Sequence, residues 1–141
     1  MNATQYLEQY PAVYDWESDG YHADIDPDTL RAWEYQRFVV TFTNAETGET
    51  FTAPWKQGLG IEEPPTAETV LETLAMDFRT VADSLDAEDF LFNLGYSTSA
   101  NGVRAGFAAW RAIQEQIAEW RRVFGDTAAQ ALEDVEEDYE D

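Results

Sequence analysis

Apolar and polar residues alternate along the stretch from Gln36 to Trp55, with an interruption at residues 44–49. A period of two is typical of antiparallel strands that bury one face. The apolar face of the predicted strand pair carries Phe38, Val40, Phe42, Phe51, Ala53 and Trp55. The interruption contains Thr47-Gly48, which favours a hairpin loop closed by a residue with positive φ.

After Pro65 the apolar residues recur every three or four positions, which predicts amphipathic helices. Thr66 is the expected N-cap of the first helix. Its apolar stripe consists of Val70, Leu74, Phe78, Val81 and Leu85. Asp86 can cap a shorter helix over residues 87–94, and Gly95 is its expected C-terminal stop. The longest stripe predicts the main core helix and consists of Val103, Phe107, Trp110, Ile113, Ile117, Trp120 and Phe124.

The pattern near the start of the chain is less regular. Residues 2–10 predict a short helix that is capped by Asn2 and ended by Pro11. We interpret residues 13–28 as a loop whose aromatic side chains tuck against the core while its acids stay solvated. A brief helical turn is expected over residues 26–32, because Asp-Pro is a favourable helix start.

These elements predict an α+β fold in which an antiparallel β-hairpin or small sheet is packed by three to four α-helices. A chain of 141 residues is long enough for one domain. We expect this domain to span residues 1–125, followed by an acidic C-terminal helix or tail over residues 126–141. An isolated hairpin is marginal in water, so the helices must cover its apolar face.

Charge restricts the functions that this chain can have. It contains 29 Asp and Glu against eight Lys and Arg, a formal net charge of -21. Direct binding to nucleic acid or to an anionic membrane is therefore not expected. The hydrophobic content of 44% indicates a folded protein, and the absence of cysteine excludes disulfides and thiolate chemistry. The chain shows neither a membrane-spanning apolar run nor signal-peptide features, so we expect a cytoplasmic protein.

One acidic stretch resembles a calcium-binding loop. Asp15, Glu17, Asp19 and Asp26 approximate the carboxylate spacing of an EF-hand. Pro11 stands where the incoming helix should be, and Asp26 replaces the long bidentate Glu. We therefore regard a solvated loop as the better interpretation, and we expect neither a metal nor another cofactor.

Candidate catalytic groups are sparse. His22 is the single histidine and has acids nearby, but residues 97–99 (Ser-Thr-Ser) lack the sequence context of a nucleophile. Gly58 and Gly60 precede a helix, yet the glutamates that follow them occupy the place of a bound phosphate. We therefore expect no enzymatic activity. The tryptophans are predicted to be core residues rather than a ligand cage, namely Trp33, Trp55, Trp110 and Trp120.

The acids that remain form rows at helical spacing, where side chains three or four apart are neighbours. The expected partner-binding acids are Glu62, Glu63, Glu68, Glu72, Glu115, Glu119, Glu133, Glu136, Glu137 and Glu140. Rows of carboxylates can imitate the phosphates of duplex DNA and occupy a DNA-binding protein. The alternative is a solvated acidic surface adapted to a salty cytoplasm.

Several motifs downstream of Trp55 occur in a fixed order. WKQGLG is followed by PPTAETVLETLAMD, then EDFLFNLGY, then an arginine-bearing helix that ends RRVFGD. In this order the chain resembles a set of small proteins encoded by bacteriophages and prophages, for which no settled activity is known. The resemblance implies that residues such as Gly58, Asp77 and Phe124 determine the fold, and that the gene comes from a mobile element.

Charge and resemblance together suggest a function. We expect a non-enzymatic phage or mobile-element protein that inhibits a host DNA-handling or defence complex of the CRISPR or restriction type, in the host cytoplasm. Its partner would be a basic DNA-binding protein. The alternative is a structural or assembly factor of a phage or halophilic host, whose acidity is adaptive.

Overall fold

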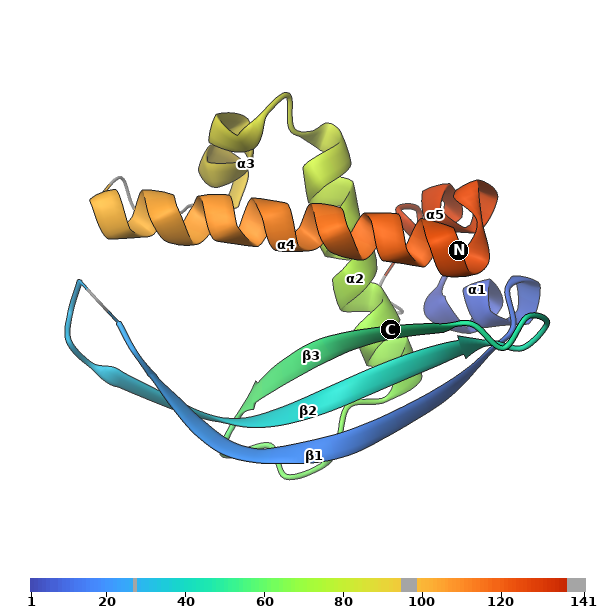
Figure 1. Ribbon diagram of the computed structural model, residues 1–141, viewed down its shortest axis with the longest axis horizontal. Helices are drawn as coiled ribbons and strands as arrows, with labels where there is room; N and C mark the ends of the chain where they lie inside the picture. The colour runs from blue at the N-terminus through green and yellow to red at the C-terminus, as the bar shows by residue number, and fades with distance from the viewer. Residues whose placement is uncertain (27, 95–98, 137–141) are drawn as a thin grey trace, which may run out of the picture.

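A computed structural model of the chain shows a three-stranded antiparallel sheet and five helices, which confirms the α+β class (Figure 1). The structure describes residues 1–26, 28–94 and 99–136, apart from the side chain of Leu94. In chain order the elements are α1 (Ala3–Gln9), β1 (Ala12–Ile25), β2 (Ala32–Asn44), β3 (Thr50–Gly58), α2 (Ala67–Asp83), α3 (Ala87–Leu94), α4 (Ala100–Phe124) and α5 (Asp126–Leu132).

The predicted hairpin is confirmed as β2 and β3. Phe42 lies opposite Phe51 and Phe38 lies opposite Trp55. Gly48 has a φ of 77° in the connecting turn, a conformation that glycine adopts without a steric penalty. The predicted apolar face of this pair is the buried one, because Val40 and Ala53 lie in the core beside the two phenylalanines.

The prediction of a loop over residues 13–28 is wrong. This segment forms β1, which pairs with β2 from Ala12↔Asn44 to Ile25↔Ala32, with an irregularity between Ser18 and Tyr21. Because β1 is an edge strand that buries little of either face, its sequence lacks an obvious apolar side. The helical turn predicted over residues 26–32 is also wrong, since a tight turn joins β1 to β2 there.

The predicted helix starts are confirmed by capping hydrogen bonds. The side chains of Asn2, Thr66 and Asp86 each accept a hydrogen bond from a backbone N–H in the first turn of α1, α2 and α3. Gly125 separates α4 from α5 with a φ of 96°. Gly95, the expected end of α3, lies outside the described residues.

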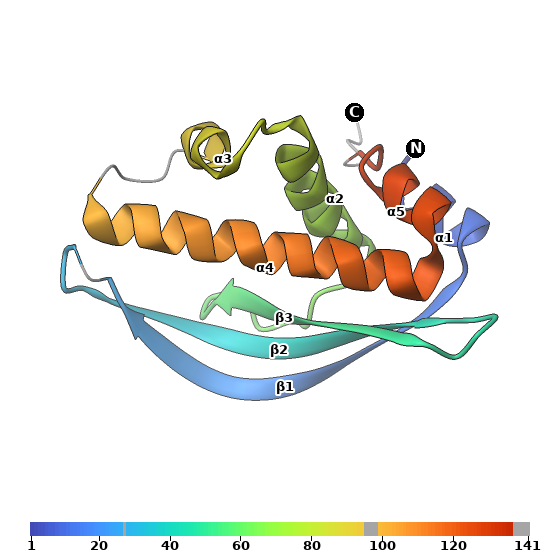
Figure 2. The same ribbon diagram turned by 45° about the horizontal axis from the view of Figure 1, so that its top comes forward.

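Helix α4 runs along the concave side of the sheet, and α2 crosses it (Figures 1 and 2). The first turns of α2 lie near the sheet, whereas its end lies on the far side of α4 (Figure 2). Trp120 of α4 fills the centre of the core, with its ring 5.5 Å from that of Phe42 and 4.9 Å from that of Phe51. Edge-to-face contacts of this kind stabilise aromatic clusters.

A buried hydrogen-bond chain joins both ends of the chain to this core. The Tyr6 hydroxyl donates to the carbonyl oxygen of Ala128 at 2.7 Å and accepts from Nε1 of Trp120 at 3.0 Å. Leu132 and Val135 are also buried. The part of residues 126–136 that was expected to be a separate tail therefore packs with the rest of the protein, while residues 137–141 lie outside the described residues.

Two core predictions are wrong. Leu85 is 93% exposed, because α2 ends at Asp83 and the chain turns before the predicted stripe is complete. Trp33 is 51% exposed, because β3 ends before it can cover this residue. The last residue of β3 to pair is Gly58, which lies opposite Tyr35, two residues after Trp33 on β2.

We predict that Tyr6→Phe lowers the free energy of unfolding by about 1–3 kcal/mol, since the buried Ala128 carbonyl and Trp120 indole lose their partner. Urea denaturation followed by tryptophan fluorescence measures this change. Tyr10→Phe is the matched control, because the Tyr10 hydroxyl only accepts an exposed hydrogen bond from Gln9. Equal effects of the two substitutions would show that the buried hydrogen bonds contribute nothing.

Candidate functional site

The first group of expected partner-binding acids lies where β3 leads into α2. Glu62 and Glu63 are exposed in the connecting loop, Glu68 is exposed in the first turn of α2, and Glu72 is partly buried one turn later. This loop is held in place by Gln57, which is almost completely buried.

Gln57 fixes the loop through three hydrogen bonds. Its Nε2 donates to the carbonyl oxygens of Ile61 at 2.8 Å and Glu63 at 2.7 Å, and its Oε1 accepts from Nε1 of Trp55 at 3.1 Å. Leaving these buried groups without partners would cost free energy, so the geometry is strongly favoured. The carboxylates of this first group therefore stand on a fixed backbone.

The second group lies on the exposed surface of α4. Glu115 and Glu119 are one turn apart and exposed. Glu119 forms an ion pair with Arg122 at 2.9 Å, and this hydrogen bond from Arg122 lowers the pKa of Glu119. Because the pair is neutral overall, this row presents less negative charge than its sequence suggests.

The third group follows α5. Glu133 is partly buried, and burial, followed by the charges of Asp134 and Asp83, raises its pKa, with a smaller opposing effect of Arg121. Arg79 of α2 donates to the carbonyl oxygen of Glu133 at 3.1 Å. Glu136 is exposed nearby in the chain. Two further expected acids, Glu137 and Glu140, lie outside the described residues.

These groups do not form one continuous row. The first group lies before and at the start of α2, whereas the third follows α5 and lies beside the last turns of α2, where Arg79 donates to the carbonyl oxygen of Glu133. Helical spacing places acids correctly within one helix, but it contains no information about how two helices cross. The three groups therefore belong to separate elements.

Strand β1 contributes acids that were not expected at a protein-binding surface. Asp15 lies opposite Thr41 and Glu17 opposite Val39, so both carboxylates project from the same face of the sheet. Both residues are exposed. The alternation of acids with Tyr14 and Trp16 is the sequence signal that could have identified this strand.

The calcium-loop interpretation of Asp15, Glu17, Asp19 and Asp26 does not fit the fold. An EF-hand wraps a compact loop around one ion, whereas three of these residues lie along an extended strand and Asp26 follows its end. Asp19 lies 3.3 Å from Nε of Arg37 in an ion pair. Within the described ranges, the structure contains no cluster of three or more His, Asp or Glu residues that could hold a metal ion.

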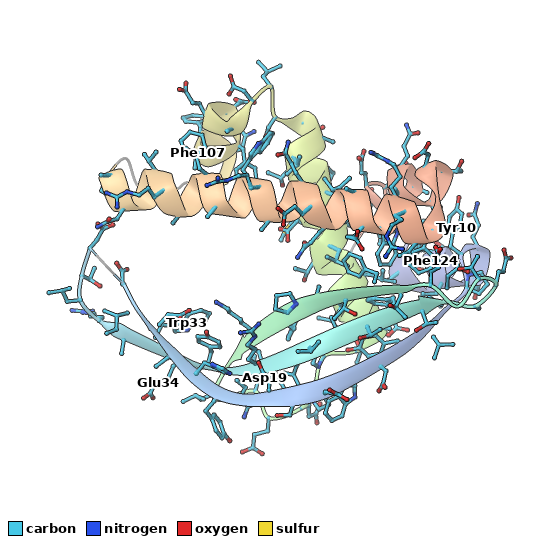
Figure 3. All side chains as sticks on the ribbon, in the orientation of Figure 1. Tyr10, Asp19, Trp33, Glu34, Phe107 and Phe124 are labelled. Carbon is cyan, nitrogen blue, oxygen red and sulfur yellow. The ribbon has the colours of Figure 1, made fainter. Side chains whose placement is uncertain are left out.

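His22 belongs to an aromatic and charged cluster on the sheet. Its ring stacks on Tyr35 with centroids 5.8 Å apart, and Lys56 lies 4.8 Å from the centre of the Tyr35 ring. Lys56 also pairs with Asp24 at 3.1 Å, and this hydrogen bond lowers the pKa of Asp24. Trp33 packs beside this cluster, with its ring centroid 4.7 Å from that of Tyr35 (Figure 3).

Of the Ser-Thr-Ser stretch at residues 97–99, the structure describes Ser99. Ser99 is the N-cap of α4, where its side chain accepts a hydrogen bond from Gly102 N–H and donates one to Asp28. Residues 97 and 98 lie outside the described residues. Ser99 therefore has a structural role at the contact between α4 and the turn that joins β1 to β2.

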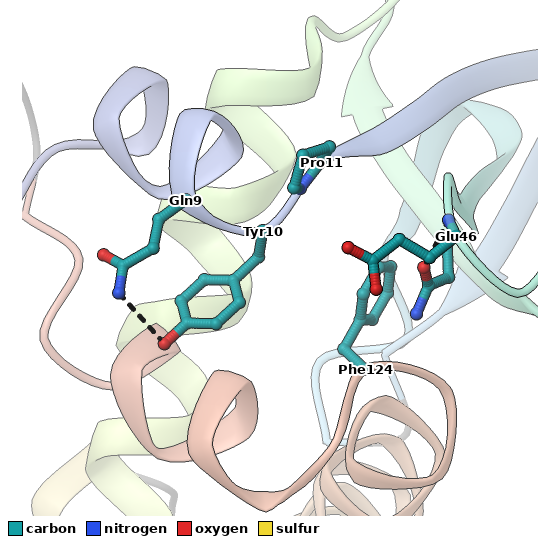
Figure 4. A pocket seen from close by; sticks show the side chains of 6 residues that line it. Gln9, Tyr10, Pro11, Glu46 and Phe124 are labelled. Atoms are coloured by element: carbon teal, nitrogen blue, oxygen red, sulfur yellow. Dashed lines mark hydrogen bonds between the residues drawn. The ribbon is translucent and has the colours of Figure 1, made fainter.

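The surface hollows are small or open. One pocket is lined by Gln9, Tyr10, Pro11, Asn44, Glu46 and Phe124 (Figure 4). Its volume of about 80 Å³ is well below the roughly 300 Å³ of an ordinary small-molecule site. An open groove between α3 and α4 is lined by Ala87, Arg104, Phe107, Trp110 and Arg111. The first pocket is therefore too small for an ordinary small molecule, and the second is open to solvent.

Comparison with known protein families, with curated proteins and with solved structures finds no match to this chain. The likeness to phage-encoded proteins thus stays an expectation based on motif order. No helix in the described part of the chain has the length and apolar character needed to cross a membrane.

One carboxylate differs from the exposed acids. Asp77 on α2 is itself partly buried, and this burial raises its pKa to about 6. The folded protein therefore holds this proton more tightly than the unfolded chain does. The contribution of protonated Asp77 to stability is complete below about pH 4 and is lost as the pH rises through 6.

We predict that Asp77→Asn raises the free energy of unfolding at pH 7.5 by about 1–2 kcal/mol, allowing for partial exposure to solvent, and changes it little at pH 4. Urea titrations at both pH values measure the difference. Glu115→Gln, which removes one exposed charge, is the control and should have a smaller effect. A similar gain at both pH values would show that Asp77 does not titrate as described.

Proposed function

We propose that this chain is a non-enzymatic protein that binds a basic, DNA-contacting protein by presenting carboxylates in place of DNA phosphates. The setting that fits the motif order is a phage or mobile element whose product inhibits a host DNA-handling or defence complex, of the CRISPR or restriction type. The observation that carries the proposal is the net charge of -21 on a folded chain.

Most of this charge is available to a partner. The ion pairs within the described ranges engage only a few of the carboxylates, at Asp19, Asp24, Glu119 and Asp126. Most other described acids are exposed. Carboxylates held by strands and helices need little further ordering when a partner binds, which favours affinity. A basic DNA-binding groove should therefore attract this surface.

Tyr14 joins strand β1 to the start of helix α2, the two elements that carry several of the exposed acids. Its hydroxyl donates to the carbonyl oxygen of Pro65 at 2.5 Å, which ties β1 to the start of α2. Burial raises the pKa of Tyr14, and the charges of Asp15 and Glu68 raise it further. Asp15 is the chain neighbour of Tyr14 and Glu68 lies in the first turn of α2, so both acids stand near the junction of these two elements.

We define the β1–α2 acidic surface as Asp15, Glu17, Glu62, Glu63 and Glu68. All five are exposed, and the loop among them is fixed by Gln57. We propose this surface as the main contact with the basic partner, because it combines acids of two elements around the outer strand.

The test uses host proteins that are retained by DNA-cellulose and eluted with salt. We predict that the immobilised protein captures a member of this fraction, that short duplex DNA releases it, and that binding weakens steeply with salt. Replacing the five acids of the β1–α2 surface by their amides should lower the affinity at least about tenfold. Capture that duplex DNA does not affect would contradict the proposal.

The matched control replaces five other exposed acids by their amides, so that both variants have the same net charge. The control acids are Glu8, Glu46, Glu88, Glu115 and Glu136. A smaller loss of affinity in the control assigns binding to the β1–α2 surface. Equal losses would assign it to net charge alone.

A second candidate is a structural or assembly factor whose acidity is adaptive. The observation that favours it is the spread of the acids over separate elements, namely the loop before α2, the surface of α4 and the segment after α5. Such a surface suits a salty cytoplasm, where ions screen the repulsion between carboxylates.

Thermal unfolding from low to molar KCl separates the two candidates. Under the proposed function we predict that the protein is already folded at about 0.15 M salt, where the Debye length is roughly 8 Å. Circular dichroism measures the melting temperature. A protein that unfolds at this ionic strength and folds only near molar salt would support adaptive acidity instead.

A further inference from the structure

Strand β1 has a long edge that pairs with no other strand in the described part of the chain. The sheet order is β1-β2-β3, so the 14-residue strand Ala12–Ile25 lies at its border. Side chains along its length are exposed. A long edge strand is a template for pairing with another chain, and most proteins cover or interrupt such edges.

The outward backbone groups of β1 can be identified. The backbone N–H of Trp16 donates a hydrogen bond to the carboxylate of the preceding residue, Asp15, at 2.8 Å. It therefore points away from β2. Inward and outward groups alternate along an antiparallel edge strand, so Tyr14 and Ser18 also direct their backbone groups outward. Outward N–H and C=O groups therefore lie on both sides of Trp16, whose own N–H would exchange the Asp15 carboxylate for a carbonyl oxygen of a new strand.

The side chains along this edge separate into two chemistries. Asp15 and Glu17 project from one face of the sheet, whereas Tyr14 and Trp16 project from the other. Trp16 is 41% exposed although it contacts Phe38. Farther along the strand, Tyr21 is 75% exposed. Exposed aromatic rings beside an open edge are typical of surfaces that bind other chains.

We infer that the outer edge of β1 binds an extended segment of the partner as a fourth strand, and that this segment alternates basic and apolar residues. Its basic side chains lie beside Asp15 and Glu17, and its apolar side chains cover Trp16. This inference rests on the proposed function, because the segment belongs to the same basic partner. Main-chain hydrogen bonds supply affinity in this mode of recognition, and alternate side chains supply specificity.

Strand geometry sets the spacing of the segment. Side chains two residues apart on a strand are separated by about 6.8 Å and lie on the same face. Lys or Arg at alternate positions can therefore meet Asp15 and Glu17 in turn, because directly opposite side chains on paired strands are neighbours. A second copy of this chain is the poorer occupant, since it would bring two chains of charge -21 together.

The first test uses the wild-type protein and an eight-residue peptide of alternating Lys and Val. Calorimetry should show binding, and NMR should show shifts of the amide signals of Tyr14, Trp16 and Ser18. The peptide is then N-methylated at alternate residues in either of two registers. Blocking the register that faces β1 should lower the affinity at least about tenfold, and blocking the other should not. Equal binding of both N-methylated peptides would overturn strand pairing.

The second test reverses the charge of the edge. The double variant Asp15→Lys, Glu17→Lys should lose its affinity for the Lys-Val peptide. It should instead bind a peptide of alternating Glu and Val. The control, Glu88→Lys with Glu115→Lys, has the same net charge, changes two exposed acids outside the β1–α2 surface, and should keep the original preference. If both variants exchange preference alike, overall charge determines binding and the inference is wrong.

The outcomes also separate this inference from the proposed function. If the edge-reversed protein no longer binds the Lys-Val peptide but still captures a DNA-binding protein that duplex DNA releases, the edge inference fails and the proposed function stands. If the wild-type protein pairs with the peptide yet captures no protein that DNA displaces, the proposed function fails and the edge still binds a basic strand.

Discussion

The indole of Trp120 and the phenol of Tyr6 form the interaction on which the rest of the fold depends. Trp120 contacts Phe42 and Phe51 from the sheet, and Tyr6 connects it to Ala128 at the start of α5. Helix α1, the sheet, α4 and α5 therefore meet at two side chains. Because both polar groups are buried and paired, the network specifies one arrangement of these elements as well as stabilising it.

Sequence patterns predicted the elements that bury one side. The β2–β3 hairpin, α2 and α4 each have a regular apolar stripe, because one face meets the core. The same reasoning failed for β1, since an edge strand that is exposed on both faces has no single apolar side. It also failed for Trp33, because a residue's distance from the end of a neighbouring strand is not visible in its own pattern.

The candidate site was predictable only within single elements. Glu62, Glu63 and Glu68 are close in sequence, so their proximity needs no tertiary information, whereas the position of Glu133 beside the last turns of α2 depends on how the helices pack. The proposed role of β1 could not be inferred without its register. Each group of acids therefore belongs to one strand, loop or helix, and its position relative to the other groups depends on how these elements pack.

The hydrogen bond from Tyr6 to Ala128 spans 122 residues of sequence. Contacts between distant segments form slowly, because the chain between them must be ordered first. During synthesis the core around Trp120 cannot close until Ala128 has left the ribosome, so its folding waits for the start of α5 to emerge. Until then β2 and β3 expose their apolar face, and the high negative charge of the nascent chain opposes its aggregation.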